Sequence, residues 1–430
     1  MKYYNLKKNE QVVSFSTAVR TGLGDNQGLF FPKKIEPLGD IESLLSLPTK
    51  ERNFKILSNF VSENLSQEQL TKVLDKTFAF PSKLVAVGEQ NYCLELFHGP
   101  TLAFKDFGAT FMATCLQEFS DGEKITILTA TSGDTGAAVA QAFYGIENIE
   151  VVILYPKGKI SVLQEKMFTT LGGNIRTLTI NGTFDDCQKL VKQSFDDQEL
   201  VKSIGLNSAN SINISRLLAQ VCYYFDAIAQ LYKKGLPKDK RDNVVISVPS
   251  GNFGNLTAGV IAKLLGAPIK RFIATTNAND TVPRYLVSGK WEPKTTIATI
   301  SNSMDVSEPN NWPRIEYMME SGQFKQDDLS GYSATENETK ASLKELKTKG
   351  YISEPHASVA YFGLNQSLQN DEIGIFLGTA HPAKFKGSVD EILGMDLPLP
   401  PELEACVNKS ILSKNIDTDF SQLKDYLLSI

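Results

Sequence analysis

Apolar residues in the middle of the chain form short runs that alternate with segments of helical periodicity. From Lys124 onward we predict strands at KITILTA, VVILYP, NIRTLTI and SIGLN. Between them, DTGAAVAQAFYG, SVLQEKMFTTLGG and TFDDCQKLVKQSF carry apolar residues three and four positions apart, which is typical of helices. Strands that alternate with helices through short connections predict a parallel sheet with covering helices.

A second series of the same kind follows a long predicted helix, Ile214 to Lys234. It contains the strand Val244–Ser250, the helix NLTAGVIAKLLG, the strand KRFIATT and, much later, the strand Ile373–Thr379. The intervening segment from Ala278 to Tyr351 is rich in Ser, Thr, Asn and Pro, then in Lys and Glu. It indicates an excursion that covers a site, followed by surface helices. The expected fold class is therefore α/β, with two parallel-sheet units.

Residues 1–95 lack this alternation and indicate mixed, mostly helical structure. Within them, Asn64–Phe80 has apolar residues at helical spacing, and Ser66 with Gln69 forms a capping-box pattern. We expect three parts: an N-terminal region of residues 1–95, a large α/β domain of residues 96–123 and 214–430, and a smaller inserted α/β domain of residues 124–213. A cleft should separate the two α/β units.

Composition and charge exclude several classes of function. The chain has 430 residues, 42% of them hydrophobic and 22% charged, and its net charge of -5 is spread along the sequence. This balance argues against nucleic acid or a membrane surface as a partner. The N-terminus lacks the apolar core of a signal peptide, and no apolar run approaches membrane-spanning length. We expect a cytoplasmic protein.

The cysteines and histidines are too scattered for a metal centre. The five cysteines form no CxxC pair and the three histidines lie far apart, so neither structural zinc nor a disulfide framework is expected. Buried, reduced thiols are the simplest interpretation.

Three strand-to-helix turns are unusually rich in Gly, Ser, Thr and Asn: TATSGDTGAA, VPSGNFGN and GTAHPAKF. Because the carboxyl ends of parallel strands share one edge, these turns should form the floor of one anion site. One such turn alone is usually only structural. Neither the P-loop nor the GxGxxG fingerprint fits, so the sequence favours one phosphate over a dinucleotide.

The segment NSANSINISRLLAQ adds a fourth polar turn, which ends at Arg216. Taken alone it could equally be a helix cap with a surface arginine. Because it follows a predicted strand, it directs Asn210, Ser211 and Arg216 toward the same cleft, where a guanidinium suits a second phosphate or a carboxylate.

The stretch ELFHGPTLAFKDFGAT places Lys105 inside an apolar run. The simplest alternatives are a pair with Asp106 or a side chain that extends to the surface. Partial desolvation between Phe104 and Phe107 would instead lower the pKa of the amine and make it nucleophilic. A desolvated lysine with a phosphate site and no nucleotide fingerprint matches what pyridoxal phosphate requires.

These motifs resemble those of the threonine synthase family of bacteria and fungi, within the fold-type II pyridoxal-phosphate enzymes. The resemblance spans the chain, through GLGDNQGLFFP, FHGPTLAFKDFG, TATSGDTGAA, NSANSINISR, SVPSGNFGN, NNWPR, SEPHASVAY and GTAHPAKF. It implies the conversion of O-phospho-L-homoserine and water to L-threonine and phosphate, with pyridoxal 5'-phosphate as cofactor and a monomeric or homodimeric enzyme.

The resemblance also implies roles for particular residues. Lys105 would form the Schiff base with the cofactor and move protons, and Thr379 would hydrogen-bond the pyridine nitrogen. The cofactor phosphate would be held by Gly251, Asn252, Phe253, Gly254 and Asn255. The substrate carboxylate would be bound near the ring by Ser132, Gly133, Asp134 and Thr135. The substrate phosphate would be bound by Asn210, Ser211, Arg216 and Lys384.

Asp134 departs from the pattern of many fold-type II relatives, which have Asn facing the phenolic oxygen of the cofactor. Two anions at that place would repel each other. Either one of them keeps a proton, or Asp134 binds another group, such as the hydroxyl of Thr131 or Thr135.

Two other functions are compatible with the same motifs. Another fold-type II lyase, such as a serine/threonine dehydratase or a phospholyase, would release a keto acid instead of threonine, although Arg216 disfavours a plain dehydratase. A non-catalytic phosphometabolite-binding protein would carry the glycine-rich turns without a nucleophilic lysine.

Overall fold

The computed structural model describes residues 1–430, and its strands form three sheets. The strands are β1 (Tyr3–Asn5), β2 (Lys8–Val13), β3 (Phe30–Pro32), β4 (Lys83–Ala86), β5 (Asn91–Glu95), β6 (Ile125–Ala130), β7 (Ile149–Pro156), β8 (Ile175–Ile180), β9 (Leu206–Ser208), β10 (Val244–Pro249), β11 (Arg271–Thr276), β12 (Leu329–Ser333), β13 (Ile373–Gly378) and β14 (Lys414–Ile416). The larger sheet has the order β12-β11-β10-β13-β5-β4 and is parallel except at β4. The smaller has the order β14-β8-β7-β6-β9 and is parallel throughout. Strands β2, β1 and β3 form an antiparallel N-terminal sheet.

Helices enclose both parallel sheets, which confirms the predicted α/β class. They are α1 (Phe15–Thr21), α2 (Ile41–Ser46), α3 (Thr49–Val61), α4 (Gln67–Thr77), α5 (Lys105–Glu118), α6 (Asp134–Phe143), α7 (Val162–Thr169), α8 (Phe184–Asp196), α9 (Gln198–Ile204), α10 (Ser215–Lys233), α11 (Gly254–Leu264), α12 (Thr281–Ser288), α13 (Trp312–Glu320), α14 (Glu336–Thr348), α15 (Pro355–Ser367), α16 (Lys386–Leu393), α17 (Pro401–Val407) and α18 (Phe420–Leu428). Short 3-10 turns are η1 (Asp25–Gln27), η2 (Lys238–Lys240), η3 (Asn302–Met304), η4 (Gln326–Asp328) and η5 (Pro382–Phe385).

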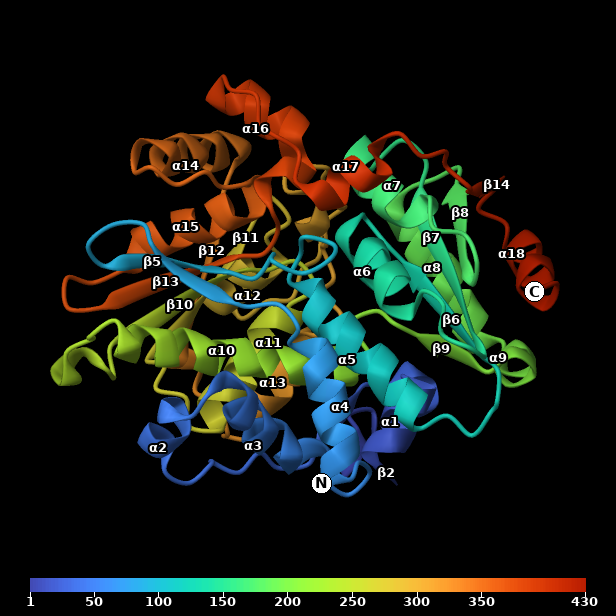
Figure 1. Ribbon diagram of the computed structural model, residues 1–430, viewed down its shortest axis with the longest axis horizontal. Coiled ribbons are helices and arrows are strands. Elements are labelled where there is room, and N and C mark those ends of the chain that lie inside the picture. Colours follow the sequence, from blue (N-terminus) through green and yellow to red (C-terminus); the bar gives the residue numbers. More distant parts are fainter.

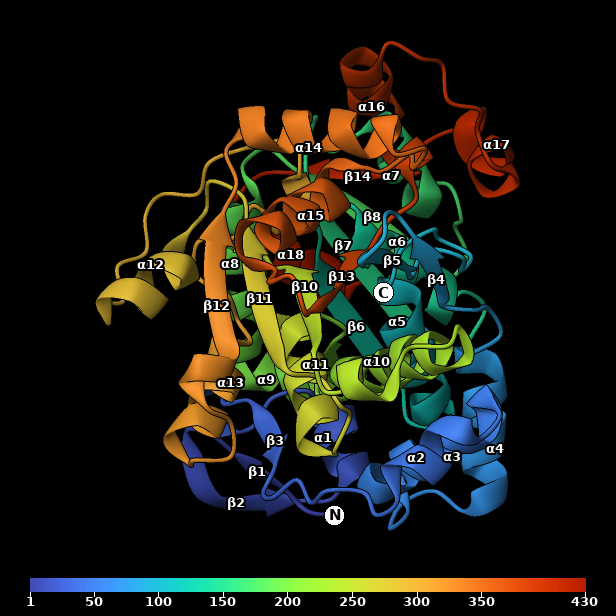
Figure 2. The same cartoon turned by 90° about the vertical axis from the view of Figure 1, so that its left-hand side faces the viewer.

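The two parallel sheets lie on opposite sides of the molecule, with α5 and α6 between them (Figure 1). The N-terminal elements form a layer beneath α10 and α5 (Figure 2). In the smaller sheet Ile127 and Val151 pack with α6, whereas Leu128 and Val152 pack with α8. Successive residues of a strand point to opposite faces, so strands covered on both sides read as continuous apolar runs.

Most predicted elements of the two α/β series are confirmed. The helix predicted over Asn64–Phe80 is α4, and Ser66 and Gln69 form the capping box. The strand predicted at SIGLN is wrong in its first half, because Ser203 and Ile204 end α9. Gly205, at φ +59°, adopts the left-handed conformation that terminates this helix before β9 begins.

The sheets divide the chain differently from the expected domain boundaries at three places. Strands β4 and β5, in the region expected to be separate and mostly helical, form one edge of the larger sheet. Strand β12 forms the other edge, within the segment expected to be an excursion with surface helices. Strand β14 pairs with β8, so the C-terminal segment returns to the smaller unit. These strands are short and only partly apolar, and pairing with a neighbour determines their conformation.

All five cysteines are buried and free. None of the helices combines the length and the apolar composition that crossing a bilayer requires.

Glycine at position 108 allows α5 and α10 to pack closely. A Cβ atom built there would lie 2.4 Å from the backbone oxygen of Arg216. A larger residue must therefore push α10 away from the helix that begins at Lys105.

We expect Gly108→Ala to lower the free energy of unfolding by about 2 kcal/mol, because overpacking forces backbone shifts. Gly387→Ala is the matched control: this helical glycine is exposed and has no atom within 4 Å of the added Cβ. It should leave stability unchanged or raise it by about 0.5 kcal/mol, since alanine favours helix. Urea unfolding of the two variants measures both; equal effects would contradict the close-packing argument.

Candidate active site

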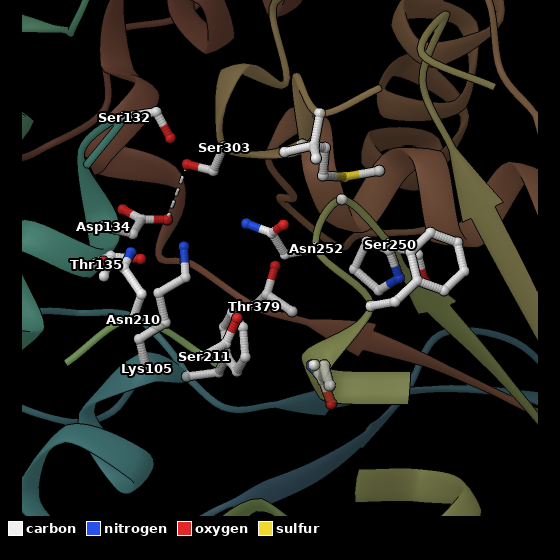
Figure 3. Close-up of a pocket in the computed structure, with 18 of the residues that line it drawn as sticks. Lys105, Ser132, Asp134, Thr135, Asn210, Ser211, Ser250, Asn252, Ser303 and Thr379 are labelled. Carbon is white, nitrogen blue, oxygen red and sulfur yellow. Dashed lines mark hydrogen bonds between the residues drawn. The ribbon is translucent and has the colours of Figure 1, made fainter. Parts of the chain in front are cut away.

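The Lys105 side chain enters a cavity between the two parallel-sheet units (Figure 3). Turns that follow β6, β9, β10 and β13 form its walls, as the sequence predicted from the shared edge of parallel strands. Most residues selected from the sequence line it: Lys105, Ser132, Asp134, Thr135, Asn210, Ser211, Arg216, Gly251, Asn252, Phe253, Gly254, Asn255 and Thr379. Gly133 and Lys384 lie beside the cavity and do not line it.

Lys105 is the first residue of α5, and backbone contacts of the segment that precedes this helix fix its position. The N–H of Phe104 donates to the backbone oxygen of Thr379 at 2.9 Å, so the turn after β13 pairs with the segment before α5. Leu102 adopts a left-handed conformation at φ +56°, which is uncommon for a residue with a Cβ. The lysine is thereby brought beside Thr379, which is remote in sequence.

The Lys105 amine is chemically unusual because it is poorly hydrated and forms no ion pair. Burial lowers the pKa of Lys105 to about 8, and although Asp134 opposes this shift, the charges of Lys384 and Arg216 reinforce it. The Phe104 ring lies 5.6 Å from Nζ. Part of the population thus carries a neutral, nucleophilic amine at neutral pH. Phe107, expected on the other flank, packs instead against Phe80 and Tyr223 in the core.

Asp106 neither faces solvent nor pairs with Lys105. It is buried, and its carboxylate accepts hydrogen bonds from the Thr101 N–H at 2.8 Å and from the Thr101 hydroxyl. Burial raises the pKa of Asp106 to about 6, although the hydrogen bonds from Thr101 act in the opposite direction. Asp106 therefore holds the turn that precedes the lysine.

Asp134 is joined to a buried lysine. Its Oδ1 lies 2.6 Å from Nζ of Lys384 and accepts from Gln164 at 3.1 Å, and its Oδ2 accepts from the Ser303 hydroxyl at 3.3 Å. Burial alone would raise the pKa of Asp134, but the ammonium groups of Lys384 and Lys105 hold it well below its usual range. The carboxylate is therefore ionised. Neither Thr131 nor Thr135, the two alternative partners, hydrogen-bonds this carboxylate, whose partners are Lys384, Gln164 and Ser303.

Lys384, which the sequence predicts as a ligand of the substrate phosphate, pairs with Asp134 and does not line the cavity. The side chain is fully buried, and Nζ donates to the backbone oxygen of Thr101 at 2.8 Å as well as pairing with Asp134. A buried ammonium is stabilised by such partners and has no free face toward the cavity.

The loop from Ser250 to Asn255 is built for close backbone approach to a ligand. Phe253 adopts a left-handed conformation at φ +61°, and the next residue begins α11. A Cβ at Gly251 would lie 2.8 Å from the Met304 Cα, so this glycine leaves room for the neighbouring turn. The amide nitrogen of the Asn255 side chain is buried without a partner, while its oxygen accepts from Tyr223 and Tyr224. Free N–H groups at a helix start favour an anion.

Asn210, Ser211 and Arg216 lie on the opposite wall. Arg216 is buried, donates to the backbone oxygen of Ala209, and leaves its Nε without a partner. Burial lowers the pKa of Arg216 to about 10, although Asp106 opposes this. Asn210 donates to the Ala130 oxygen at 3.0 Å. A buried guanidinium with an unused N–H is suited to an anionic ligand.

Several residues of this site gave no clear signal in the sequence. Ser303, Met304, Val306 and His356 line the cavity. The first three lie in the polar excursion, where nothing marks them as special. His356 follows a Glu-Pro pair that signals a helix start. This signal does not predict the hydrogen bond that the His356 ring accepts from the Ser303 N–H.

Side chains of the motif NNWPR hydrogen-bond the loops that carry Ser211 and Asn252. Asn311 donates to the Ser211 hydroxyl at 2.9 Å and to the Asn252 oxygen at 3.1 Å. Arg314 is buried and donates to the backbone oxygens of Ser211 and Ile212. Trp312 packs edge-on against Phe253.

Known proteins resemble the chain along its whole length. Models described as pyridoxal-phosphate dependent enzyme, threonine synthase N terminus and threonine synthase C-terminal match residues 82–375, 2–78 and 358–427. The chain is 62% identical to a threonine synthase from Haemophilus influenzae over 428 residues, covering 100% of each. The chain belongs to the threonine synthase family. Its fold matches the crystal structure of threonine synthase from Escherichia coli with a TM-score of 0.96, at 55% identity and 100% coverage of both chains.

A threonine synthase from Brucella melitensis has been solved with pyridoxal phosphate bound. It matches with a TM-score of 0.89 and 31% identity, covering 99% of this chain and 98% of that one. The threonine synthase family thus belongs to the pyridoxal-phosphate enzymes. The glycine loop at the start of α11 and the unpartnered amide of Asn255 in the present site fit the phosphate of this cofactor.

The lowered pKa predicts an unusual pH dependence for Lys105. In cofactor-free protein, labelling of this amine by an acylating reagent should reach half of its maximal rate near pH 8. Only the neutral amine reacts, so the rate should rise with pH through this value. Peptide mass spectrometry across pH 6–11 measures it, with a model lysine peptide as the reference. A midpoint near that of the model peptide, at about 10.4, would contradict the desolvation argument.

Proposed function

We propose that this chain converts O-phospho-L-homoserine and water to L-threonine and phosphate, with pyridoxal 5'-phosphate as cofactor. One observation carries the proposal: the Lys105 amine, free of ion pairs and with a pKa of about 8, faces a cavity between a glycine loop and a buried arginine. Membership of the threonine synthase family along the full chain supports the same reaction.

The cofactor would be held by two parts of the large unit. Lys105 Nζ would bind it covalently, and its phosphate would be bound by Gly251, Asn252, Phe253, Gly254 and Asn255. When bound, pyridoxal phosphate supplies a carbonyl carbon to which amines add and a ring that withdraws electrons from the substrate Cα. The Thr379 hydroxyl would donate to the pyridine nitrogen and leave it uncharged, whereas a carboxylate would favour its protonation.

Different residues would bind the two anionic groups of the substrate, its carboxylate and its phosphate. The N-terminal turn of α6, with Ser132, Gly133 and Thr135, would bind the carboxylate, since N–H groups at a helix start favour negative charge. Asn210, Ser211 and Arg216 would bind the substrate phosphate. Lys384 would act on this site only through Asp134, because it is fully buried against that carboxylate.

Proton transfer in this proposal is assigned to Lys105. Its neutral amine would take the proton from Cα of the substrate, in a cavity from which burial excludes most water. A second proton would leave Cβ, Arg216 would stabilise the phosphate that leaves Cγ, and a proton would be added to Cγ in its place. The hydroxyl group of water would then bond to Cβ, the remaining proton of this water would pass to the released phosphate, and a proton would be returned to Cα. The ionised Asp134 would favour the protonated form of the amine after the transfer, whereas the charge of Lys384 would oppose it.

The protein is proposed to work in the cytoplasm as a monomer or homodimer, without a nucleic-acid or membrane partner. The mild net charge of -5 supports the last point.

Purified protein loaded with the cofactor should release phosphate and form threonine from O-phosphohomoserine. Lys105→Ala should abolish turnover, since no other amine faces the cavity, whereas the exposed Lys238→Ala should not change it. Phosphate release and amino-acid analysis measure both products. Formation of 2-oxobutanoate instead of threonine would assign the chain to the lyases that release a keto acid, and turnover by Lys105→Ala would overturn the role of this lysine.

Arg216→Gln should raise the KM for O-phosphohomoserine by about a hundredfold, because the phosphate loses a charged partner in a buried site. Arg216→Lys should have a smaller effect, since the charge remains and the paired N–H groups do not. The remote Arg176→Gln, on β8, serves as the control for losing an arginine. Initial rates over a substrate range and inhibition by inorganic phosphate provide the measurement; an unchanged KM in Arg216→Gln would remove this residue from the substrate site.

A further inference from the structure

The 3-10 turn η3 contacts both parallel-sheet units at the cavity. On one side the Ser303 hydroxyl donates to Oδ2 of Asp134 at 3.3 Å, and Asp134 belongs to the smaller unit (Figure 3). On the other side the turn packs on the loop from Ser250 to Asn255, since a Cβ at Gly251 would lie 2.8 Å from the Met304 Cα. A shift of this turn would therefore move groups on both sides of the site.

A buried histidine and glutamate hold the turn. The Ser303 N–H donates to Nε2 of His356 at 3.1 Å, and Nδ1 of His356 lies 2.6 Å from Oε2 of Glu354. His356 is only 3% exposed and Glu354 only 1%, so water does not replace these contacts. The imidazole ring also packs on Phe385, with 4.8 Å between the ring centroids.

The hydrogen bonds assign the tautomer of His356. Because Nε2 accepts from a backbone N–H, it carries no proton, and the proton of the neutral ring lies on Nδ1. Nδ1–H then donates to the Glu354 carboxylate, which orients the ring. The other tautomer would point an N–H at the N–H of Ser303, and the contact would be lost.

Glu354 would not need the histidine in order to cap its helix. Its carboxylate accepts from the backbone N–H groups of His356 and Ala357 at the start of α15. The contact between the Glu354 carboxylate and the His356 ring is additional to this capping, and through the ring it connects Glu354 to Ser303 at the cavity.

We propose that Glu354 and His356 are positioning residues for the reaction. Glu354 selects the tautomer of His356, His356 fixes the backbone of Ser303, and Ser303 with Met304 sets Asp134 and the Gly251 loop in their working positions. The inference rests on the proposed function. It assigns no proton transfer to the histidine.

A pair of substitutions at position 356 separates the hydrogen bond from the packing. Gln and Leu have similar sizes, but only the Gln side chain can offer an oxygen to the Ser303 N–H. We expect His356→Leu to lower kcat by about tenfold or more, as the loss of one buried hydrogen bond implies, with a smaller change in KM. His356→Gln should recover most of kcat.

Glu354→Gln tests the tautomer with almost no change in volume. A Gln has one acceptor oxygen, so it cannot accept from Nδ1–H, the His356 N–H and the Ala357 N–H together as the carboxylate does. The orientation that keeps the Ala357 contact points the Gln NH2 group at Nδ1 and favours the other tautomer. We expect kcat to fall as in His356→Leu. Glu338→Gln is the matched control, because Glu338 caps α14 at the surface through Thr335 and does not line the cavity. It should leave kcat unchanged.

Hydrogen exchange of the Ser303 amide provides a readout that does not depend on activity. It should be faster in His356→Leu and Glu354→Gln than in the wild type, and slow in His356→Gln. If the Leu variant does not fold, the comparison of Glu354→Gln with the wild type and Glu338→Gln decides. Equal exchange and equal kcat in the Gln and Leu variants, or no change in Glu354→Gln, would overturn the proposal. A wild type that forms no threonine would instead refute the proposed function, and the exchange rates would still test the contact.

Discussion

A buried ion pair between Asp134 and Lys384 joins the two parallel-sheet units at the cavity. Asp134 begins α6 in the smaller unit, Lys384 lies in η5 after the larger sheet, and their side chains are 5% and 0% exposed. Removing one member of such a pair leaves an uncompensated buried charge, at a cost of about 3–5 kcal/mol. The relative position of the two units at the site therefore depends on this contact, and so does the charge of Asp134.

In the proposed function, the ion pair would also remove the repulsion expected between Asp134 and an anionic oxygen of the cofactor. With Lys384 beside it, the carboxylate is ionised, and its negative charge is already balanced before any ligand approaches. Lys105 stays outside this pair. Its pKa is set mainly by burial, with positive charges nearby, and this combination leaves part of the amine neutral at neutral pH.

The loop from Ser250 to Asn255 and the opposite wall of the cavity, with Asn210 and Ser211, depend on a second layer of polar contacts. Asn311 and Arg314 hold the backbone near Ser211, and His356 holds Ser303. These side chains place the groups that face the cavity, and rigid support of this kind is what precise catalytic geometry requires. The close packing of α5 on α10 at Gly108 belongs to the same support, since it connects the lysine helix to Arg216.

The sequence by itself determined the α/β class, most of the two strand–helix series, the family and most residues that line the cavity. Short apolar runs and glycine-rich turns are local signals, and Lys105 was conspicuous because an ammonium rarely stands in an apolar run. Only the tertiary structure decided that β4, β5, β12 and β14 are strands, because their conformation depends on partners remote in sequence. It also decided that Lys384 neutralises Asp134 instead of facing the cavity, and that His356 reaches Ser303. Burial and pairing of charges depend on which side chains meet across the two units, and no local pattern contains that information.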